Sequence, residues 1–235
     1  MKKIIFISII GVLALILGVF FLFFNTYTIS GKVVDLVNKE AVEGIEVSFE
    51  KIISITNKEG VFQLKNIKKY QSGVIKIKVP TGYEELTPIT LRGNVQNIEI
   101  SPSLKTMVTR LNYAIRNGQH DYLWDYMHPD DQAYWESKEK YSTVFKKIKN
   151  IKAEAGLVET AKLEIGENIR KLDTWTHEIT EKKYINVMEV PMEAKINGND
   201  NGIQLQYYQK IDGIWRYFTE SNKETLQKII NAYEK

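Results

Sequence analysis

Four aspartates in the second half of the chain are the side chains most able to do chemistry. They lie within eleven residues of one another and among two tyrosines: Asp121, Asp125, Asp130 and Asp131, with Tyr122 and Tyr126. A carboxyl group buried beside a tyrosine could act as a general base. The alternative is that Asp130 and Asp131 are first-turn charges of a helix and that Asp121 caps one. We favour this structural interpretation and predict no catalytic residue.

The sequence does not predict a metal site or a reactive thiol. The chain has no cysteine, which excludes disulfides, thiolate metal sites and a cysteine nucleophile. His120, His128 and His177 are not spaced as ligands of one ion, and surface or capping roles are expected for them. The run Asn197–Gly202 resembles the start of a calcium loop, but Tyr208 stands where a bidentate glutamate is required. We therefore predict a polar hairpin loop there, no metal site and no cofactor.

Four neutral or aromatic side chains form the predicted ligand-binding set. Gln204, Gln206 and Tyr208 alternate along an expected strand and so share one of its faces, and Trp175 is expected to join them from another strand. Such a set suits a polar ligand or the backbone of a partner better than acid–base work. Other aromatic residues could stack on sugars, but their spacing on short helices favours a place in the core. They are Tyr122, Trp124, Tyr126, Tyr134 and Trp135.

Helices followed by strands are expected to position these residues. Met107, Leu111 and Ala114 recur at helical spacing in a helix that should end at Asn117–Gly118. Two further helices are predicted over His120–Met127 and Glu224–Tyr233, and another begins at Pro129 and runs through Phe145 to a cluster of lysines near its end. Alternating polar and apolar residues predict an antiparallel sheet with strands at Lys162–Ile169, Thr174–Ile179, Tyr184–Ile196, Ile203–Ile211 and Ile214–Phe218.

The preceding stretch, residues 28–102, has a period of two and regular turn signals. Val74–Val79 is a strand with clear alternation, and Asn57–Gly60 is predicted to be a hairpin connection with Gly60 in the left-handed region. Short strands every 8–12 residues are typical of an all-β sandwich. Pro102 and the change of period after it predict a domain boundary between this module and residues 103–235.

The N-terminal segment is apolar enough to enter a membrane. Ile4–Phe24 contains no charge, and a helix of that length would span the hydrocarbon core of about 30 Å. Its bulky C-terminal end lacks the small residues of a signal-peptidase site, so a retained signal-anchor is predicted within residues 1–27. Lys2 and Lys3 precede the span, which predicts a cytoplasmic N-terminus and an extracytoplasmic remainder.

The charge of the chain gives no sign of nucleic-acid binding. The net charge of +3 includes Lys2 and Lys3, and residues 105–235 carry twenty basic and twenty acidic side chains. The folded part is therefore almost neutral and lacks a basic footprint. Frequent lysine, isoleucine and asparagine favour a Gram-positive bacterium of low GC content.

Residues 28–102 resemble carboxypeptidase regulatory-like domains. The resemblance rests on four ordered segments, Ile29–Asp35, Ala41–Val47, Thr56–Leu64 and Gly82–Glu84. It implies a small transthyretin-like β-sandwich that spaces or stabilises its neighbours and carries no catalytic residue.

Residues 103–235 resemble the nuclear transport factor 2-like superfamily. The resemblance covers about 115 residues and rests on the order of helices and strands and on the segment Asp212–Phe218, with its glycine, tryptophan and aromatic residues. It implies an α+β cone in which helices cover one face of a curved antiparallel sheet. Some members of the superfamily are isomerases or dehydratases and others only bind, so the fold does not decide the function.

These expectations together give a fold class and a function. The predicted fold class is an N-terminal transmembrane helix, then an all-β sandwich, then an α+β cone. The predicted function is a non-enzymatic accessory protein of the bacterial cell envelope, held in the lipid bilayer by Ile4–Phe24. Its distal module would bind a protein or a cell-wall component. The alternatives are an enzyme or small-molecule receptor that uses the cavity of the cone, and a simple spacer.

Overall fold

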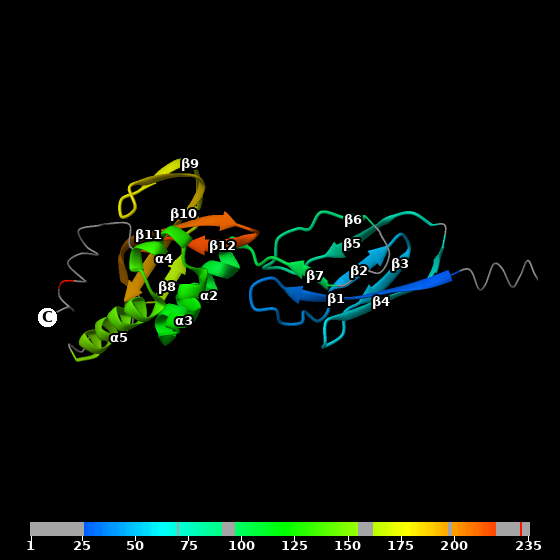
Figure 1. Cartoon of the computed structure of the whole chain (residues 1–235), viewed down its shortest axis with the longest axis horizontal. Coiled ribbons are helices and arrows are strands. Elements are labelled where there is room, and N and C mark those ends of the chain that lie inside the picture. Colours follow the sequence, from blue (N-terminus) through cyan, green and yellow to red (C-terminus); the bar gives the residue numbers. More distant parts are fainter. Residues whose placement is uncertain are drawn as a thin grey trace, which may run out of the picture. The chain divides into compact units, whose positions relative to one another are not determined.

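The computed structural model describes residues 26–69, 71–90, 97–154, 162–196 and 199–219, together with residue 231. The chain divides into two compact units, one ending at Ser101 and the other beginning at Pro102. Figure 1 labels the helices and strands of both units. The division lies one residue from the boundary expected from the change of hydrophobic period.

The predicted fold class is wrong. The described residues are mostly β, with four helices, and none of these helices is long and apolar enough to cross a membrane. The segment Ile4–Phe24, on which the transmembrane prediction rested, lies outside the described residues. That prediction used only length and hydropathy, which show what a helix could span but not whether a segment forms one. The second unit contains both kinds of element, four helices and five strands among the residues described.

One sheet of the first unit is built around its first strand. β1 (Thr26–Asp35) pairs antiparallel with β4 (Val61–Lys68) and parallel with β7 (Asn97–Ile100). The buried carboxylate of Asp35 ends β1: its Oδ1 accepts the backbone N–H of Val37 (2.8 Å) and its Oδ2 accepts the hydroxyl of Tyr83 (2.9 Å). These bonds satisfy a carboxylate that would be costly to bury without partners.

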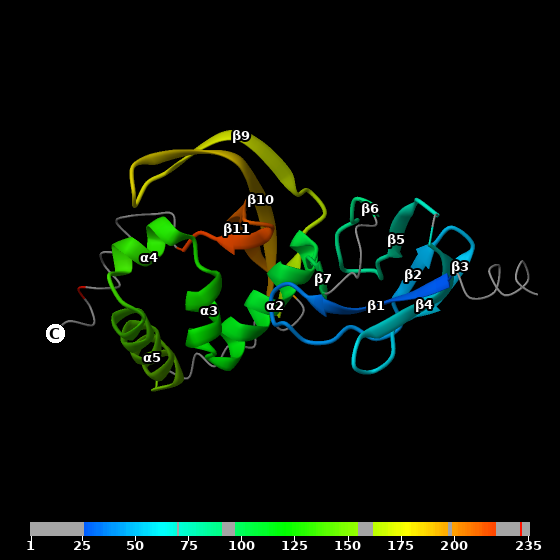
Figure 2. The same cartoon turned by 45° about the vertical axis from the view of Figure 1, so that its right-hand side comes forward.

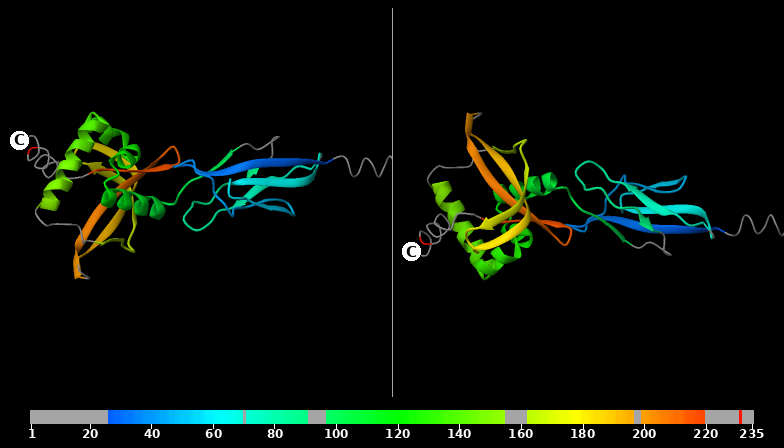
Figure 3. Two further views of the ribbon diagram at one scale, coloured as in Figure 1. Left: turned by 90° about the horizontal axis from the view of Figure 1, so that it is seen from below. Right: turned by 90° about the horizontal axis from the view of Figure 1, so that it is seen from above.

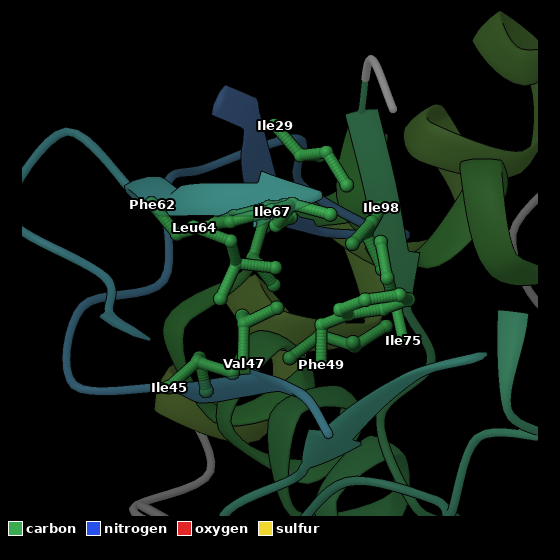
Figure 4. Packing of buried hydrophobic residues seen from close by; sticks show 11 residues of the cluster. Ile29, Ile45, Val47, Phe49, Phe62, Leu64, Ile67, Ile75 and Ile98 are labelled. Carbon is green, nitrogen blue, oxygen red and sulfur yellow. The ribbon is translucent and has the colours of Figure 1, made fainter. Parts of the chain in front are cut away.

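The other sheet of the first unit has the strand order β3-β2-β5-β6, with every neighbouring pair antiparallel. Its strands are β3 (Ile52–Ile55), β2 (Glu46–Phe49), β5 (Val74–Lys78) and β6 (Ile89–Thr90). Alternation turns Val47 and Phe49 toward the side chains of Phe62 and Leu64 on β4, and Figure 4 shows these groups packed together between the strands. Each buried side chain of this size contributes about 1.5–3 kcal/mol relative to its exposed state.

The turn Asn57–Gly60 crosses from one sheet to the other. β3 pairs with β2 and β4 pairs with β1, so the predicted hairpin connection is wrong. The left-handed conformation predicted for Gly60 is confirmed, with φ of +73°. A Cβ there would lie 2.5 Å from the carbonyl oxygen of Val33, so only glycine fits.

The second unit begins with two helices at the predicted positions. α2 (Leu104–Asn117) is capped by the Ser103 side chain, which accepts the N–H of Thr106, and it ends at Gly118 with φ of +64°. The predicted stop at Asn117–Gly118 is therefore confirmed. α3 (His120–Tyr126) follows after a single turn.

The single helix predicted from Pro129 to Phe145 is two helices. α4 (Pro129–Trp135) stops at Glu136, which has φ of +67°, and α5 (Lys138–Glu154) starts again immediately. The Ser137 hydroxyl accepts the N–H of Lys140, so the new helix has its own cap. Helical periodicity continued across the break and did not reveal it. The closing helix predicted over Glu224–Tyr233 lies outside the described residues, apart from residue 231.

β10 (Lys182–Ile196) is the centre of the second unit's sheet. β11 (Asn199–Ile211) pairs along one edge, and β9 (Arg170–His177) and β8 (Lys162–Ile165) pair in succession along the other. β12 (Ile214–Tyr217) lies beyond β11. All five predicted strands are present, with boundaries moved by up to four residues. Figures 2 and 3 show β9 and β10 as a long curved pair of strands.

Two residues of β10 shape this curve. Asn186 has φ of +56°. The buried side chains on either side of it are Tyr184 and Val187, so the alternation of buried and exposed residues along β10 is interrupted at this point. Pro191 lies where β10 exchanges β9 for β8 as its partner, and its carbonyl accepts the N–H of Gly166 (2.8 Å). Proline has no N–H to donate, so it suits a position where one edge of the strand changes its partner.

Candidate functional site

The structure divides the four predicted ligand-binding residues between two faces of the sheet. Gln206 and Tyr208 lie on the face of β11 that packs against α2. The Tyr208 hydroxyl donates to Gln206 Oε1 (2.6 Å), and Gln206 Nε2 donates to Asn112 Oδ1 of α2 (3.4 Å). Tyr208 is 1% exposed, so it is a core residue and not the lining of an open pocket. Gln204 shares their strand face but is exposed.

Trp175 lies on the opposite face. Its ring stacks on Tyr207, with 4.4 Å between the centroids and an interplanar angle of 19°, and it also contacts Phe218 at 4.8 Å. Tyr207 neighbours Tyr208 along β11 and so points to the other side of the sheet. Trp175 therefore belongs to a separate aromatic cluster, completed by His128, His177 and Tyr184.

The predicted aspartates are also in different environments. Asp121 and Asp125 are exposed on α3, and both carboxylates face the ammonium group of Lys138 (3.3 and 3.2 Å). Such surface pairs contribute little to stability. Asp130 and Asp131 lie in the first turn of α4, as the structural interpretation predicted. Asp131 differs from the other three because it is completely buried.

Asp131 and His177 form a buried pair. Asp131 Oδ1 lies 3.2 Å from His177 Nδ1, and both side chains are 0% exposed. Asp131 Oδ2 accepts two hydrogen bonds from Thr219, one from the backbone N–H (2.6 Å) and one from the hydroxyl (2.8 Å). Burial raises the pKa of Asp131 to about 6, although the Thr219 bonds act in the opposite direction. The pair joins α4, β9 and the segment after β12.

A chain of polar contacts connects this pair to the surface. The turn between β9 and β10 carries Thr180, whose hydroxyl contacts both His177 Nδ1 (3.3 Å) and the Tyr184 hydroxyl (3.1 Å). Tyr184 donates to Asp130 Oδ2 (2.8 Å), and Lys182 donates to Asp130 Oδ1 (2.6 Å). The hydrogen bond from Lys182 is the main reason that the pKa of Asp130 is lowered. These contacts hold the tip of the β9–β10 hairpin against the start of α4.

His128 has a structural role in the same region. Its Nδ1 accepts the N–H of Asp130 (3.2 Å), which caps α4, and its Nε2 lies 3.0 Å from Gln209 Oε1. These contacts assign the proton to Nε2, which donates to Gln209. Gln209 Nε2 in turn donates to the carbonyl of Ile185 (2.9 Å), which fixes the orientation of the amide. Burial lowers the pKa of His128, so the neutral ring is favoured.

The capping role predicted for histidine is thus confirmed for His128. The same prediction is wrong for His177, which is in the interior, and for His120, which is buried with its ring 5.8 Å from that of Phe145. Within the described ranges, no three histidine and acidic side chains are grouped so that they could hold a metal ion. The aromatic residues predicted for the core are divided: Trp135 is fully buried, whereas Tyr122, Trp124, Tyr126 and Tyr134 are half-buried.

An acid of pKa about 6 beside an imidazole has the composition of a general acid–base pair. A catalytic group must touch its substrate, however, and neither Asp131 nor His177 has any exposed surface. Both groups are instead fixed by contacts that hold three parts of the fold together. The geometry therefore suits a structural role for this pair.

Exposed apolar side chains of the second unit include a row on the face of β11 away from α2. We call Ile203, Leu205 and Tyr207 the apolar row; Ile203 is 67% exposed and Leu205 is 43% exposed, while Tyr207 is half-buried beneath Trp175. Sequence reasoning missed this row because it assigned the other face of β11 to a ligand. The signal that could have found it is Asn112, a polar residue on the apolar side of α2, which needs buried polar partners such as Gln206.

No family model matches the chain, and no curated protein is significantly similar to it. The resemblances of the two modules to carboxypeptidase regulatory-like and nuclear transport factor 2-like domains therefore stay predictions from the residues quoted for them.

Proposed function

We propose that the chain is a non-enzymatic accessory protein of the bacterial cell envelope that binds a protein partner through the apolar row of its second unit. The exposure of Ile203 and Leu205 side by side on one strand face carries this proposal. Aliphatic side chains in such a row lose their contact with water when a partner covers them, and each buried Å² contributes about 25 cal/mol. Trp175 and Tyr207 continue the row with a stacked aromatic pair of the kind that anchors interfaces.

The state of the buried acid–base pair supports binding over catalysis. The side chain with the most strongly perturbed carboxyl pKa, Asp131, is held by Thr219 and His177 inside the unit. The exposed carboxylates of Asp121 and Asp125 face the ammonium group of Lys138.

Binding through the apolar row is tested by crosslinking in intact cells. A photoreactive residue at position 203 should give a discrete crosslinked product, and Leu205→Asp in the same chain should reduce its yield about 30-fold or more, the effect expected for loss of an anchor worth about 2 kcal/mol. Gln204→Asp is the matched control, since it introduces the same charge on the other face of β11. Equal yields from the two variants would contradict the proposal.

The enzyme alternative makes a different prediction for the same cells. A folded Asp131→Asn protein that keeps its crosslinks but loses the cellular phenotype would favour catalysis over binding. Under the binding proposal, Asp131→Asn leaves both the crosslinks and the phenotype unchanged.

We further propose that both units lie outside the cytoplasm and that the chain is attached to the membrane through Ile4–Phe24. The support is the uncharged composition of this segment and the two lysines that precede it. The protein should therefore resist extraction with alkaline carbonate, and protease added after wall removal should digest residues beyond about Thr28. Recovery of a shorter, freely secreted form would contradict attachment.

A further inference from the structure

One end of the first unit is rich in lysine. β1 begins at this end, where Thr26 pairs with Lys68 at the end of β4. β5 starts a few residues later in the chain, and its Ile75 pairs with Phe49 at the end of β2. The starts of β1 and β5 and the ends of β2 and β4 therefore meet here. We call this the basic end and define it by four exposed lysines, which are Lys51, Lys65, Lys69 and Lys76.

The charges of the first unit are separated along it. Residues 49–54, 64–69 and 71–76, which make up the basic end, contain five lysines and one acidic residue, Glu50. The other described residues of this unit contain four lysines and eight acidic residues. The unit is thus almost neutral as a whole, but the basic end carries a net positive charge and the remainder a net negative charge.

The basic end is also the end nearest to the apolar segment Ile4–Phe24. Phe24 precedes Thr26 by only two residues, and two residues of extended chain span at most about 7 Å. β7 runs parallel to β1, and Ile100 pairs with Asp35 at the opposite end of the unit. The chain therefore enters the unit at the basic end and leaves it at the other end.

Lysines in this position have a favourable interaction with an anionic membrane surface. Each lysine close to such a surface favours the bound state by about fivefold, and Glu50 opposes the attraction of one of them. Attachment of the chain through Ile4–Phe24 would keep the basic end at a high effective concentration beside the lipid, so weak attraction is sufficient.

An exposed isoleucine lies on the same sheet face as one of the lysines. Ile53 of β3 pairs with Ser48 of β2, which pairs in turn with Lys76 of β5. Directly paired residues of antiparallel strands point to the same side of a sheet. Ile53 is 60% exposed, and an aliphatic side chain beside a lysine suits the boundary between headgroups and acyl chains.

We propose that the basic end binds the anionic lipid headgroups of the membrane that holds the chain. Its four lysines lie beside lipid phosphates, and Ile53 lies between the headgroups. This inference rests on the proposed attachment through Ile4–Phe24, because that attachment brings the basic end to the bilayer. It adds a second lipid contact, one that depends on the charge of the lipid.

The test uses the full chain with a single fluorescent label, which the absence of cysteine makes possible. Ser72→Cys places the label at an exposed position of the basic end, and Thr81→Cys places it at an exposed position beyond the far end of β5. Each labelled chain is reconstituted into vesicles that carry a trace of acceptor dye on the headgroups. One set of vesicles is phosphatidylcholine, and the other is equal parts phosphatidylcholine and phosphatidylglycerol.

Energy transfer from the label to the headgroup acceptor reports how close the basic end is to the lipid. Transfer from position 72 should be higher in the anionic vesicles than in the neutral ones, and high salt should remove the difference because it screens exposed charges. Transfer from position 81 should not rise. A rise of equal size at both positions would mean that the unit approaches the lipid without orientation, and the inference would be wrong.

Charge variants show where the attraction arises. Lys65→Gln combined with Lys69→Gln should lower the ratio of bound to unbound basic ends by about 25-fold and so remove most of the rise at position 72. Lys58→Gln combined with Lys78→Gln is the matched control, since it removes the same charge from exposed positions outside the basic end. Equal losses in the two double variants would assign the effect to net charge and overturn the inference.

Flotation separates this inference from the proposed attachment. A chain that floats with phosphatidylcholine vesicles at high salt is attached without help from the lysines. If it floats but transfer from position 72 is the same in both kinds of vesicle, the attachment stands and the inference is wrong. If it does not float, both fail. If transfer is unchanged but soluble polyphosphate raises the anisotropy of the label at position 72, the basic end binds phosphate polymers in place of lipid, which also overturns the inference.

Discussion

Replacing Tyr208 by alanine is expected to destabilise the second unit by about 3–5 kcal/mol, the range measured when a large buried aromatic side chain is truncated. Tyr208 is among the largest fully buried side chains of the chain, and its hydroxyl donates to Gln206. The variant loses the apolar contacts of the ring, creates a cavity and leaves the Gln206 amide oxygen without this donor. Denaturant unfolding followed by tryptophan fluorescence measures the change.

Two matched variants separate the contributions to this effect. Tyr208→Phe keeps the ring and removes only the hydroxyl, so a loss of about 1 kcal/mol is expected. Leu205→Ala truncates an exposed side chain on the same strand and should change stability by about 0.5 kcal/mol or less. A Tyr208→Ala protein that unfolds at the wild-type denaturant concentration would show that this side chain is not in the core. Loss of binding in Tyr208→Ala is therefore expected to follow from unfolding.

Asp131→Asn is expected to stabilise the protein at pH 7 by up to about 3 kcal/mol and to flatten the dependence of stability on pH between about 4 and 6. The folded-state pKa of Asp131 is raised from 3.8 to about 6, so the folded state binds more protons than the unfolded state in this window. Stability then falls as pH rises through the window, by about 1.4 kcal/mol per unit of pKa difference. Asparagine cannot ionise, and its oxygen can still accept both Thr219 bonds.

Asp130→Asn is the control, because the neighbouring carboxylate should respond with the opposite sign. Lys182 lowers the pKa of Asp130, so its stabilising contribution is present above its unfolded pKa and is lost as pH falls. Asp130→Asn should therefore destabilise the protein at pH 7, by less than about 1 kcal/mol because the pair is partly exposed. His128 is present in every variant, and its titration cancels when Asp131→Asn is compared with the wild type. It does not cancel for Asp130→Asn, because the charge of Asp130 raises the pKa of His128. Identical pH profiles for Asp131→Asn and the wild type would contradict the assignment of the raised pKa.

Some features of this fold followed from the sequence because they depend on neighbouring residues. The stop of α2 at Gly118 and the left-handed Gly60 are set by local backbone sterics, which a few residues contain in full. The first-turn positions of Asp130 and Asp131 follow in the same way from Pro129, which suits the start of a helix. The strands of the second unit were visible because alternation of polar and apolar residues is itself a local pattern.

The sequence alone showed that the chain has no cysteine, which excludes thiol chemistry, and that the folded part is almost neutral. It also determined the positions of most strands and helix ends. Only the tertiary structure decided which face of β11 is buried, because both faces carry large side chains and the choice depends on Asn112, 94 residues away from Gln206. It also decided that Asp131 is buried against His177. An aspartate in the first turn of a helix is acceptable in solvent, and only the packing of β9 and Thr219 places this one in the interior. Local periodicity specifies that a strand has two faces, but long-range packing selects the one that meets water.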